Sequence, residues 1–485
     1  MPRLRPRALV TLVVLAAAAA APAEGRAVNG STGRSLTTGF TDPVFNTDAF
    51  GERAARMQEA AGLGASSVRV DLSWWQVADK RPAGDATDPA NPAYSWSQTD
   101  AAVREAEAHG LDVLFNVFRA PPWAEGPDRP ANVPAATWRP DATAFGEFAL
   151  AAARRYSGTF ADPAKRLPRV RFWGVWNEPN LGVMLTPQWV QSGGRPAPAS
   201  PAIYRSLLNA LYRSVKSVAA SNLVVAGSTS PYGDDAGGDR MRPARFLREL
   251  FCLDSALRYR GCADRPRLDV LSHHPYNVAG PLRRARHADD VSTPDMGKVV
   301  RILRRAQRVG AVRPAGSKRV WVTEIGWESR PPDPDGVYER QHARWLEYAF
   351  YRLWRAGVDR ILWFQVRDQR AFPSYASTFQ TGVELADGKL KRAARAFRFL
   401  FVVDRVGRKA VRVWGKAPDA GSVRVQRRTR RGWRTLASVR PGANRVFYAR
   451  LPLVGAHDMR AISRAGAVSI QWPATMNLMT VDPRS

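Results

Sequence analysis

Two glutamates carry the chemistry that this sequence offers most clearly. Glu178 stands in Trp-Asn-Glu-Pro and Glu324 in Thr-Glu-Ile-Gly-Trp, and each follows directly on a short run of mostly apolar residues. Where two such runs are strands of one barrel, the side chains that end them face each other across its mouth. A pair of carboxyl groups placed in this way can break a glycosidic bond, since one protonates the leaving oxygen and the other attacks the sugar carbon or activates water.

Both glutamates have competing interpretations. They could be exposed loop residues without a chemical role, and Glu328, one helical turn beyond Glu324, competes with it for the same function. The choice depends on which of them the surrounding elements bring together.

The chain between residues 36 and 402 has the pattern that would position such a pair. Short runs rich in β-branched and aromatic residues alternate with longer stretches of helical periodicity, which is typical of βαβ units. The expected strands are 36–41, 67–71, 112–118, 170–176, 223–228, 268–272, 319–323 and 360–364. The expected helices are 48–63, 98–109, 141–156, 203–220, 294–309, 339–356 and 391–402.

Eight strands that alternate with helices predict an α/β fold, a (β/α)8 TIM barrel over residues 35–402. The structural alternative is an open, doubly wound sheet. That fold normally has a Gly-rich phosphate loop after an early strand, and this sequence has none.

The paired motifs resemble clan A of the retaining glycoside hydrolases. In that clan the acid/base glutamate follows an asparagine at the end of strand four and the nucleophile ends strand seven, as Asn177-Glu178 and Glu324 do here. Further positions similar to the clan lie at other strand ends: Arg69 on strand two, His274 and Tyr276 after strand six, and Trp363 on strand eight. The likeness covers about residues 36–402 and is nearest to families 39 and 5.

The resemblance implies double displacement with net retention of configuration. Glu324 would attack the sugar and Glu178 would act as acid and then as base. Arg69 and Tyr276 would keep the nucleophile ionised, because both favour the charged form of a neighbouring carboxyl group. Asn177 would bond the 2-hydroxyl of the sugar.

Several further residues are candidates for the carbohydrate site. By resemblance, His274 would orient a carboxylate or contact sugar, and Trp363 would lie under the sugar. Trp123 and Trp327 could stack on sugar rings or belong to the core. His273 is expected to be a packing residue. The residues Arg283, Arg284 and Arg286 could bind a uronate or sulfate group or form a solvated face.

We expect neither a metal nor a cofactor. His273 and His274 have no third histidine or carboxylate close in sequence to complete a ligand set.

The first residues read as a secretory signal. Arg3, Arg5 and Arg7 precede an apolar run over 8–21, and Ala-Pro-Ala at 21–23 supplies small residues for cleavage. We expect a signal peptide over 1–23 and a linker over 24–34. The alternative is an uncleaved anchor, but the run is shorter than the roughly 20 residues that cross a bilayer. The protein is expected to be secreted, with no transmembrane segment, and could associate with the cell wall.

The two cysteines of the chain are consistent with export, because they can form a disulfide in an oxidising compartment. Cys252 and Cys262 are close in sequence, and in an oxidising compartment they are expected to form a local disulfide. Free thiols are the alternative.

Residues 403–485 have short alternating runs and no clear helical pattern, which predicts a small antiparallel β domain. The expected strands are 410–414, 422–427, 433–439, 446–451 and 468–472. Residues 405–485 hold 17 Lys and Arg against 3 Asp and Glu, so they contribute +14 of the net charge of +30. The basic tail could bind an anionic cell-surface polymer; the alternatives are a packing module and arginines scattered over a solvated surface.

Composition and motifs together narrow the function. With 45% hydrophobic residues and 16 Trp the chain is not disordered. Its positive charge would suit nucleic acid, but the leader and the lack of a recognition motif argue against that partner. The prediction is a secreted retaining glycosidase acting on an oligo- or polysaccharide, and an anionic polymer is among the candidate substrates. The alternative is a catalytically idle barrel that binds a wall polymer. Sugar, linkage, endo or exo attack, and hydrolysis or transglycosylation stay open.

Overall fold

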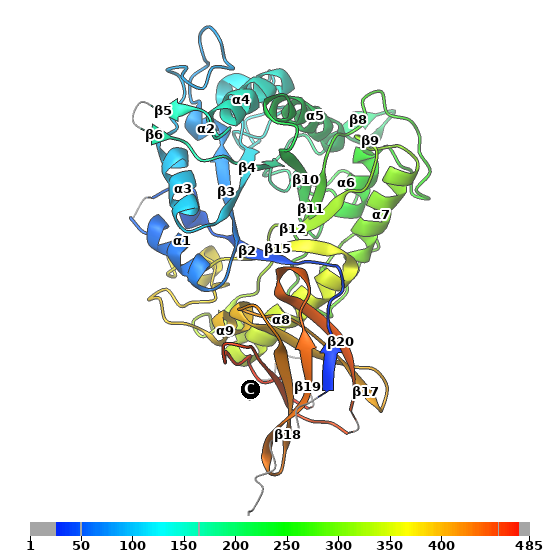
Figure 1. Ribbon diagram of the computed structural model, residues 1–485. Coiled ribbons are helices and arrows are strands. Elements are labelled where there is room, and N and C mark those ends of the chain that lie inside the picture. Colours follow the sequence, from blue (N-terminus) through cyan, green and yellow to red (C-terminus); the bar gives the residue numbers. More distant parts are fainter. Residues whose placement is uncertain (1–25, 49–50, 163–164, 454, 475–485) are drawn as a thin grey trace, which may run out of the picture.

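A closed barrel of eight parallel strands forms the larger part of the molecule (Figure 1). The computed structural model describes residues 26–48, 51–162, 165–453 and 455–474. The barrel strands, in order around the barrel, are β2 (Thr37–Thr41), β3 (Ser67–Ser73), β4 (Asp112–Phe118), β7 (Phe172–Val175), β10 (Leu223–Thr229), β11 (Val270–His273), β12 (Arg319–Val322) and β15 (Val358–Phe364). Their order in space is their order in sequence, so the predicted TIM barrel is confirmed.

Helices surround the barrel (Figure 1). They are α1 (Arg53–Gly62), α2 (Trp74–Val77), α3 (Ser97–Ala108), α4 (Ala142–Arg155), α5 (Ser200–Val218), α6 (Pro243–Leu250), α7 (Gly297–Arg308), α8 (Glu339–Ala356) and α9 (Arg392–Arg398). All expected strands and helices of the barrel overlap observed ones. Two helices were not expected: α2 and α6 have only 4 and 8 residues, which is too short for a clear helical period in the sequence.

The inside of the barrel shows which strand residues point inward. One apolar cluster fills it, with one residue from each of six strands: Leu114, Phe172, Val225, Val270, Trp321 and Leu362. Below Leu362, the Arg360 guanidinium lies over the rings of Phe172 and Trp321, at 4.2 and 4.4 Å from their centroids. Because successive strand residues point to opposite sides, Arg360, Leu362 and Phe364 all face the barrel interior.

The tail forms two sheets below the barrel (Figure 1). One sheet has the antiparallel order β16 (Leu400–Arg405), β17 (Ala410–Lys416) and β20 (Val446–Pro452). The other has the order β1 (Arg26–Asn29), β19 (Gly432–Arg440), β18 (Val423–Thr429) and β21 (Met459–Ile462). Helices α8 and α9 lie between the tail and the barrel, where Tyr351 and Trp354 of α8 pack against Trp414 of β17.

Several sequence-based boundaries differ from the structure. The expected linker 24–34 contains β1, which pairs in parallel with β19; its four residues have no alternating pattern, and the partner strand determines their conformation. The expected helix 391–402 ends at Arg398, and β16 begins at Leu400, before the expected boundary at 403. The expected strand 468–472 forms only isolated bridges, from Val468 and Trp472 to β21.

Short strand pairs occur in the loops. They are β5 (Ala161–Asp162) with β6 (Lys165–Arg166), β8 (Trp189–Ser192) with β9 (Arg195–Pro198), and β13 (Ser329–Arg330) with β14 (Val337–Tyr338). The expected disulfide is present, since Cys252 and Cys262 are joined beyond the end of α6. Among the described residues, no helix is long and apolar enough to cross a membrane. The predicted signal peptide lies outside the described residues.

The inner cluster of the barrel generates a stability prediction. Leu362 is fully buried, whereas Leu390, in a loop, is 65% exposed. We expect Leu362→Ala to lower the free energy of unfolding by about 2–5 kcal/mol, because it leaves a cavity. Leu390→Ala is the matched control and should change it by less than about 0.5 kcal/mol. Urea denaturation measures both, and equal effects of the two substitutions would contradict the inward position of Leu362.

Candidate active site

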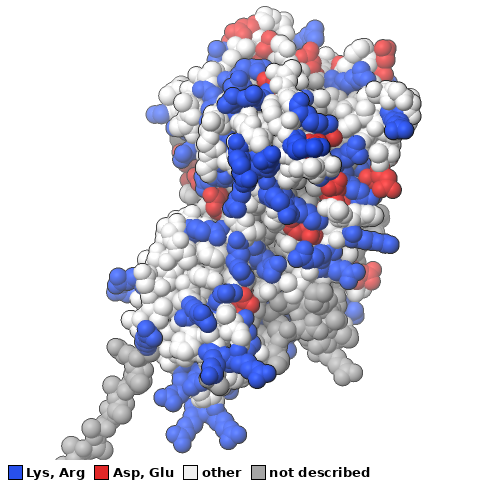
Figure 2. Space-filling model, turned by 90° about the vertical axis from the view of Figure 1, so that its right-hand side faces the viewer, with Lys and Arg blue, Asp and Glu red and all other residues white. Residues whose placement is uncertain are grey.

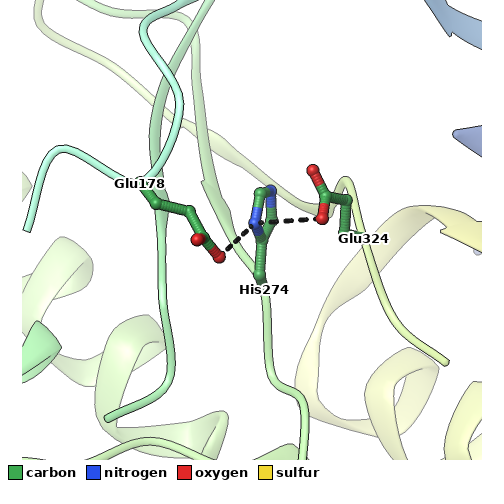
Figure 3. A group of neighbouring side chains, drawn as sticks. All are labelled: Glu178, His274 and Glu324. Carbon is green, nitrogen blue, oxygen red and sulfur yellow. Dashed lines mark hydrogen bonds and ion pairs between the residues drawn. The ribbon is translucent and has the colours of Figure 1, made fainter. Parts of the chain in front are cut away.

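Glu178, His274 and Glu324 meet at the mouth of the barrel (Figure 3). They follow the carboxyl ends of β7, β11 and β12, by three, one and two residues. One oxygen of each glutamate and one nitrogen of the histidine lie within 4.8 Å of one another. The glutamate side chains are 16% and 13% exposed, so solvent reaches both, while the imidazole is fully buried. The structure thus brings together the two carboxylates that the sequence singled out.

The backbone that carries Glu178 is held in an unusual conformation. Trp176 has φ 60° and Glu178 has φ 40°, values in the left-handed region that non-glycine residues rarely adopt. Such conformations cost about 1–3 kcal/mol each and persist where the surroundings enforce them, which is often at functional sites. Here Trp176 is anchored, since it is buried and its indole N–H donates to the carbonyl of Met184 over 2.7 Å.

His274 lies between the two glutamates (Figure 3). Its Nδ1 is 3.0 Å from Glu178 Oε1 and 3.7 Å from Glu324 Oε2. Its Nε2 is 2.9 Å from Thr323 Oγ1 and 3.4 Å from Nη1 of Arg69. Because an arginine only donates hydrogen bonds, Nε2 is an acceptor and the proton belongs on Nδ1. The Nδ1–H group then points at the two carboxylates.

Arg69 is the buried cation of the site. Its side chain is 2% exposed, and its Nη1 donates to Glu324 Oε1 over 2.5 Å. Nη2 donates to Asp71 Oδ1 over 2.8 Å and to Asn177 Oδ1 over 2.9 Å. Burial opposes the charge of this guanidinium, but Asp71 and Glu324 outweigh burial and raise the pKa of Arg69. Arg69 therefore joins three strand ends through one planar group.

The surroundings of Glu324 favour its ionised form. Burial alone would raise its pKa, but His274, Arg69 and the Tyr276 hydroxyl, which donates to Oε2 over 3.0 Å, together lower the pKa of Glu324. Tyr276 itself stays protonated, because burial and the charges of Glu324 and Glu178 raise its pKa well above the ordinary value. These groups hold an ionised carboxylate at the mouth of the barrel.

Asp71 belongs to the site and was missed from the sequence. Besides Arg69, it accepts hydrogen bonds from the Asn116 amide over 3.2 Å and from the Asn46 amide over 3.4 Å. Its side chain is 23% exposed. Strand alternation is a signal that could have found it, because Asp71 is two residues from Arg69 on β3 and shares its inward face.

Trp363, which the resemblance places beneath the sugar, lies elsewhere, and Trp327 belongs to the core, the second of its two interpretations. Trp363 is fully buried and Trp327 is 4% exposed; their rings pack on each other outside the barrel, against α8. Their indole N–H groups donate to the carbonyl of Thr381 and to Asn277. Trp363 points outward from β15, because its neighbour Leu362 points inward. Trp327 packs beside Trp363, so neither ring faces the mouth.

Phe364 takes the inward position at the end of β15. Its ring is partly exposed and contacts the rings of Tyr276 and Phe379, with centroids 6.4 and 5.2 Å away. Phe379 is 49% exposed. A line of aromatic rings therefore runs from Tyr276, beside Glu324, to the surface.

The other candidates lie apart from the glutamate pair. Trp123 follows β4 and is half-buried, and its indole N–H donates a hydrogen bond to the carbonyl of Ala78. Its role in stacking on sugar stays a prediction. His273 packs as expected, between Thr229 and the carbonyl of Val291.

Glu328 does not compete with Glu324. Burial and the neighbouring Asp333 raise the pKa of Glu328 to about 7, and no contact joins it to the pair among the described residues. The arginines of the loop after β11, Arg283, Arg284 and Arg286, are exposed.

The glutamates and His274 also have spacing that would suit a metal ion. However, both oxygens of Glu324 already accept hydrogen bonds, one from Arg69 and one from Tyr276. A guanidinium at 2.5 Å already supplies the positive charge that a cation would bring. The donor set therefore fits a catalytic carboxylate pair better than a metal site.

Comparisons with known proteins agree with the barrel. No protein-family model matches the chain, and no curated protein sequence does. Among solved structures, a family 39 glycoside hydrolase from the gut symbiont Bacteroides cellulosilyticus WH2 matches with a TM-score of 0.52 and 17% identity, over 87% of this chain and 81% of that chain. This chain has the fold of the clan A glycoside hydrolases.

Two further structures resemble the chain at lower scores. A glucosidase from Croceicoccus marinus matches with a TM-score of 0.48 and 15% identity, over 88% of this chain and 82% of that one. A GH30 endoxylanase from Clostridium papyrosolvens C71 matches with a TM-score of 0.45 and 12% identity, over 88% and 96%. The fold assignment rests on the family 39 structure and the closed barrel.

The Arg69 network generates a prediction about stability and pH. Because the pKa of Glu324 is lowered from 4.5 in the folded protein, the stabilisation from its ion pair is present above pH 4.5 and is lost as the pH falls through the lowered value. We expect Arg69→Met to lower the free energy of unfolding by about 3–5 kcal/mol at pH 7, since it leaves buried carboxylates without their cation. The loss should shrink below pH 4.5.

Urea denaturation between pH 7 and pH 3.5 measures this loss. Arg424→Met, at an exposed arginine without an ion pair among the described residues, is the control and should have little effect at any pH. A loss for Arg69→Met that is the same at every pH would show that only packing, and no charge interaction, had been removed.

Proposed function

We propose that this chain is a retaining glycoside hydrolase that cleaves O-glycosidic bonds of an oligo- or polysaccharide. One observation carries the proposal: an oxygen of Glu178 and an oxygen of Glu324 lie within 4.8 Å of each other at the mouth of the barrel. Retaining enzymes hold their carboxyl groups about 5–5.5 Å apart, whereas inverting enzymes need about 6.5–9.5 Å to admit a water molecule. The short separation favours direct attack by one carboxylate.

The first step forms a glycosyl-enzyme. Glu324, ionised by its neighbours, attacks the anomeric carbon, and the bond from that carbon to the glycosidic oxygen breaks. Glu178 gives its proton to the departing oxygen. The Nδ1–H of His274 bonds Glu178 through Oε1, which leaves Oε2 to carry this proton.

The second step releases the sugar. Water attacks the same carbon, Glu178 takes a proton from the water, and the bond to Glu324 breaks. Arg69 and Tyr276 stabilise the carboxylate that leaves, and they hold it at the reacting carbon in both steps. Asn177 is partly exposed and is oriented by Arg69, so its amide can bond a sugar hydroxyl beside the reaction.

Glu178 and Glu324 generate the direct test of this proposal. We expect Glu324→Gln to abolish hydrolysis of aryl β-glycosides. Glu178→Gln should lower the rate about 10²–10⁴-fold for poor leaving groups, and much less for nitrophenolates, which leave without a proton. Glu328→Gln is the matched control and should keep wild-type activity. NMR of the first product should show retained configuration.

Two outcomes would contradict the mechanism. Inverted product would exclude Glu324 as nucleophile. Polysaccharide binding by the wild type without hydrolysis of any glycoside in the panel would favour the idle, polymer-binding barrel instead.

We also propose that the protein acts outside the cytoplasm, because its first 23 residues have the pattern of a cleavable leader. Mass spectrometry of the protein from culture medium tests this. An N-terminus near residue 24 is expected, and protein retained in the cell with residues 1–23 intact would contradict it.

The charges at the site favour a neutral sugar at the position of cleavage. Glu178, Glu324 and Asp71 face the mouth, and in the part of the chain that the structure describes Arg69 is the one guanidinium bonded to them. A uronate bound there would add a further carboxylate in a partly desolvated site, where like charges repel strongly. This argues against the anionic substrate considered from the sequence.

Asp71 provides a test of this charge argument. For glucosides and glucuronides with the same aryl group, we expect the wild type to have the higher kcat/KM on the glucoside. Asp71→Asn removes one negative charge and should shift the ratio about 10-fold or more toward the glucuronide. Asn46→Ala, which removes an uncharged partner of Asp71, should leave the ratio unchanged. An unchanged ratio in Asp71→Asn would overturn the argument.

A further inference from the structure

A groove lined by arginines lies on the outer face of the tail, away from the glutamate pair. Its volume is about 690 Å³, and the arginines that line it are Arg424, Arg440, Arg445 and Arg464. We call it the arginine groove. The other lining residues are small or uncharged (alanine, glycine, serine and proline), and no acidic residue is among them.

Strand alternation places two of these arginines on the solvent face of the sheet. Val423 and Val439 are fully buried, whereas Arg424 and Arg440, one position further along β18 and β19, are exposed. Arg424 is paired in register with Ser438, which also lines the groove. Arg424 and Arg440 are therefore carried by two paired antiparallel strands.

The groove has features of a built site. Gly421 has φ 107°, and a Cβ there would lie 2.6 Å from Cδ of Arg464. The absence of a side chain at this glycine lets the stem of Arg464 lie along the groove wall. Arg445 is held by a hydrogen bond from its Nη1 to the carbonyl of Pro418.

The positive charge of the groove is not neutralised by the protein. Among the described residues, Arg424, Arg440 and Arg464 form no ion pair. The nearby carboxylate, Asp419, accepts hydrogen bonds from Ser463 Oγ over 2.5 Å and from the Ala465 amide over 3.3 Å. Guanidinium groups left without carboxylates favour anionic groups from outside.

Basic residues extend beyond the groove along the same sheet. Arg428 and Arg460 lie over the ring of Trp433, at 5.5 and 4.3 Å from its centroid. Figure 2 shows that Lys and Arg also far outnumber Asp and Glu over the tail on the side of the molecule that it draws. A series of cations along a sheet suits a chain with repeated negative charges better than a single small anion.

The surface favours a glycan over the other polyanions. Single-stranded nucleic acid binds through exposed aromatic faces on which bases stack, but Trp433 is covered by two guanidinium groups. Membrane surfaces are bound with the help of exposed apolar side chains. Among the described tail residues, Val468 is the one large apolar side chain with more than a third of its surface exposed.

We propose that the arginine groove binds a polyanionic polysaccharide, one that carries sulfate or carboxylate groups, and holds the protein on it. This binding is separate from the proposed hydrolysis, since the groove includes none of the residues at the barrel mouth. The enzyme would be retained on an acidic matrix while the barrel cleaves glycosidic bonds of neutral sugars.

The test uses the full chain and the triple variant Arg424→Gln, Arg440→Gln, Arg464→Gln. Affinity for dextran sulfate, polygalacturonate and uncharged dextran is measured by biolayer interferometry at 50 and 200 mM NaCl. We expect the wild type to bind dextran sulfate, polygalacturonate or both, more weakly at the higher salt, and not to bind dextran. The triple variant should lose about 10-fold or more in affinity. The two charged polymers distinguish sulfate from carboxylate recognition.

The matched control removes the same charge elsewhere. Arg301→Gln, Arg304→Gln and Arg308→Gln change three exposed arginines of α7 and should leave the affinity within about twofold of wild type. The proposal is overturned if both triple variants lose affinity equally, if the groove variant keeps it, or if dextran binds as well as the charged polymers. Tighter binding of single-stranded DNA than of either charged polysaccharide would also overturn it. Activity on small glycosides is measured in parallel, so that failure of hydrolysis and failure of binding are distinguished.

Discussion

The contact between Arg69 and Glu324 is the constraint on which the site depends. The carboxylate of Glu324, just beyond the end of β12, is largely withdrawn from solvent, which disfavours its charge, and Arg69 supplies a compensating positive group from β3, across the barrel. The same guanidinium bonds Asp71 and Asn177. This buried cation thus acts with His274 to favour the ionised form of Glu324, and it orients Asn177, the residue that precedes Glu178.

The barrel makes this arrangement possible because it brings the ends of distant strands to one place. Leu362 and Trp321 fill the interior below the site, so residues further along the same strands can approach one another only at the mouth. His274 contacts residues from several strand ends at once. Its ring has two carboxylates on one side and a threonine and an arginine on the other. The packed apolar interior therefore confines the contacts between polar side chains of different strands to the mouth of the barrel.

The sequence predicted the barrel and the carboxylate pair because each depends on a strong local pattern. Glu178 and Glu324 end strand-like runs, and eight such runs alternate with helices. The direction of a single side chain is harder to predict, since a shift of one residue exchanges the two faces of a strand. Trp363 was assigned by likeness to a family, while the inward residue is Phe364. Asp71 has no motif of its own, and its role appears only through Arg69. The strand β1 pairs with residues about 400 positions further along the chain, so no local sequence pattern predicts this strand.

That pairing of β1 with β19 ties the opening of the chain to its final section. During synthesis the opening strand emerges first, yet its partner exists only when the barrel has been completed. The pair joins the segment before the barrel to the tail sheet that follows it, and so limits fraying of both segments. The tail is therefore not an independent module. Removing it would leave β1 without its hydrogen-bond partner. Removing residues 26–29 would expose the edge of β19, and an exposed strand edge is prone to aggregation.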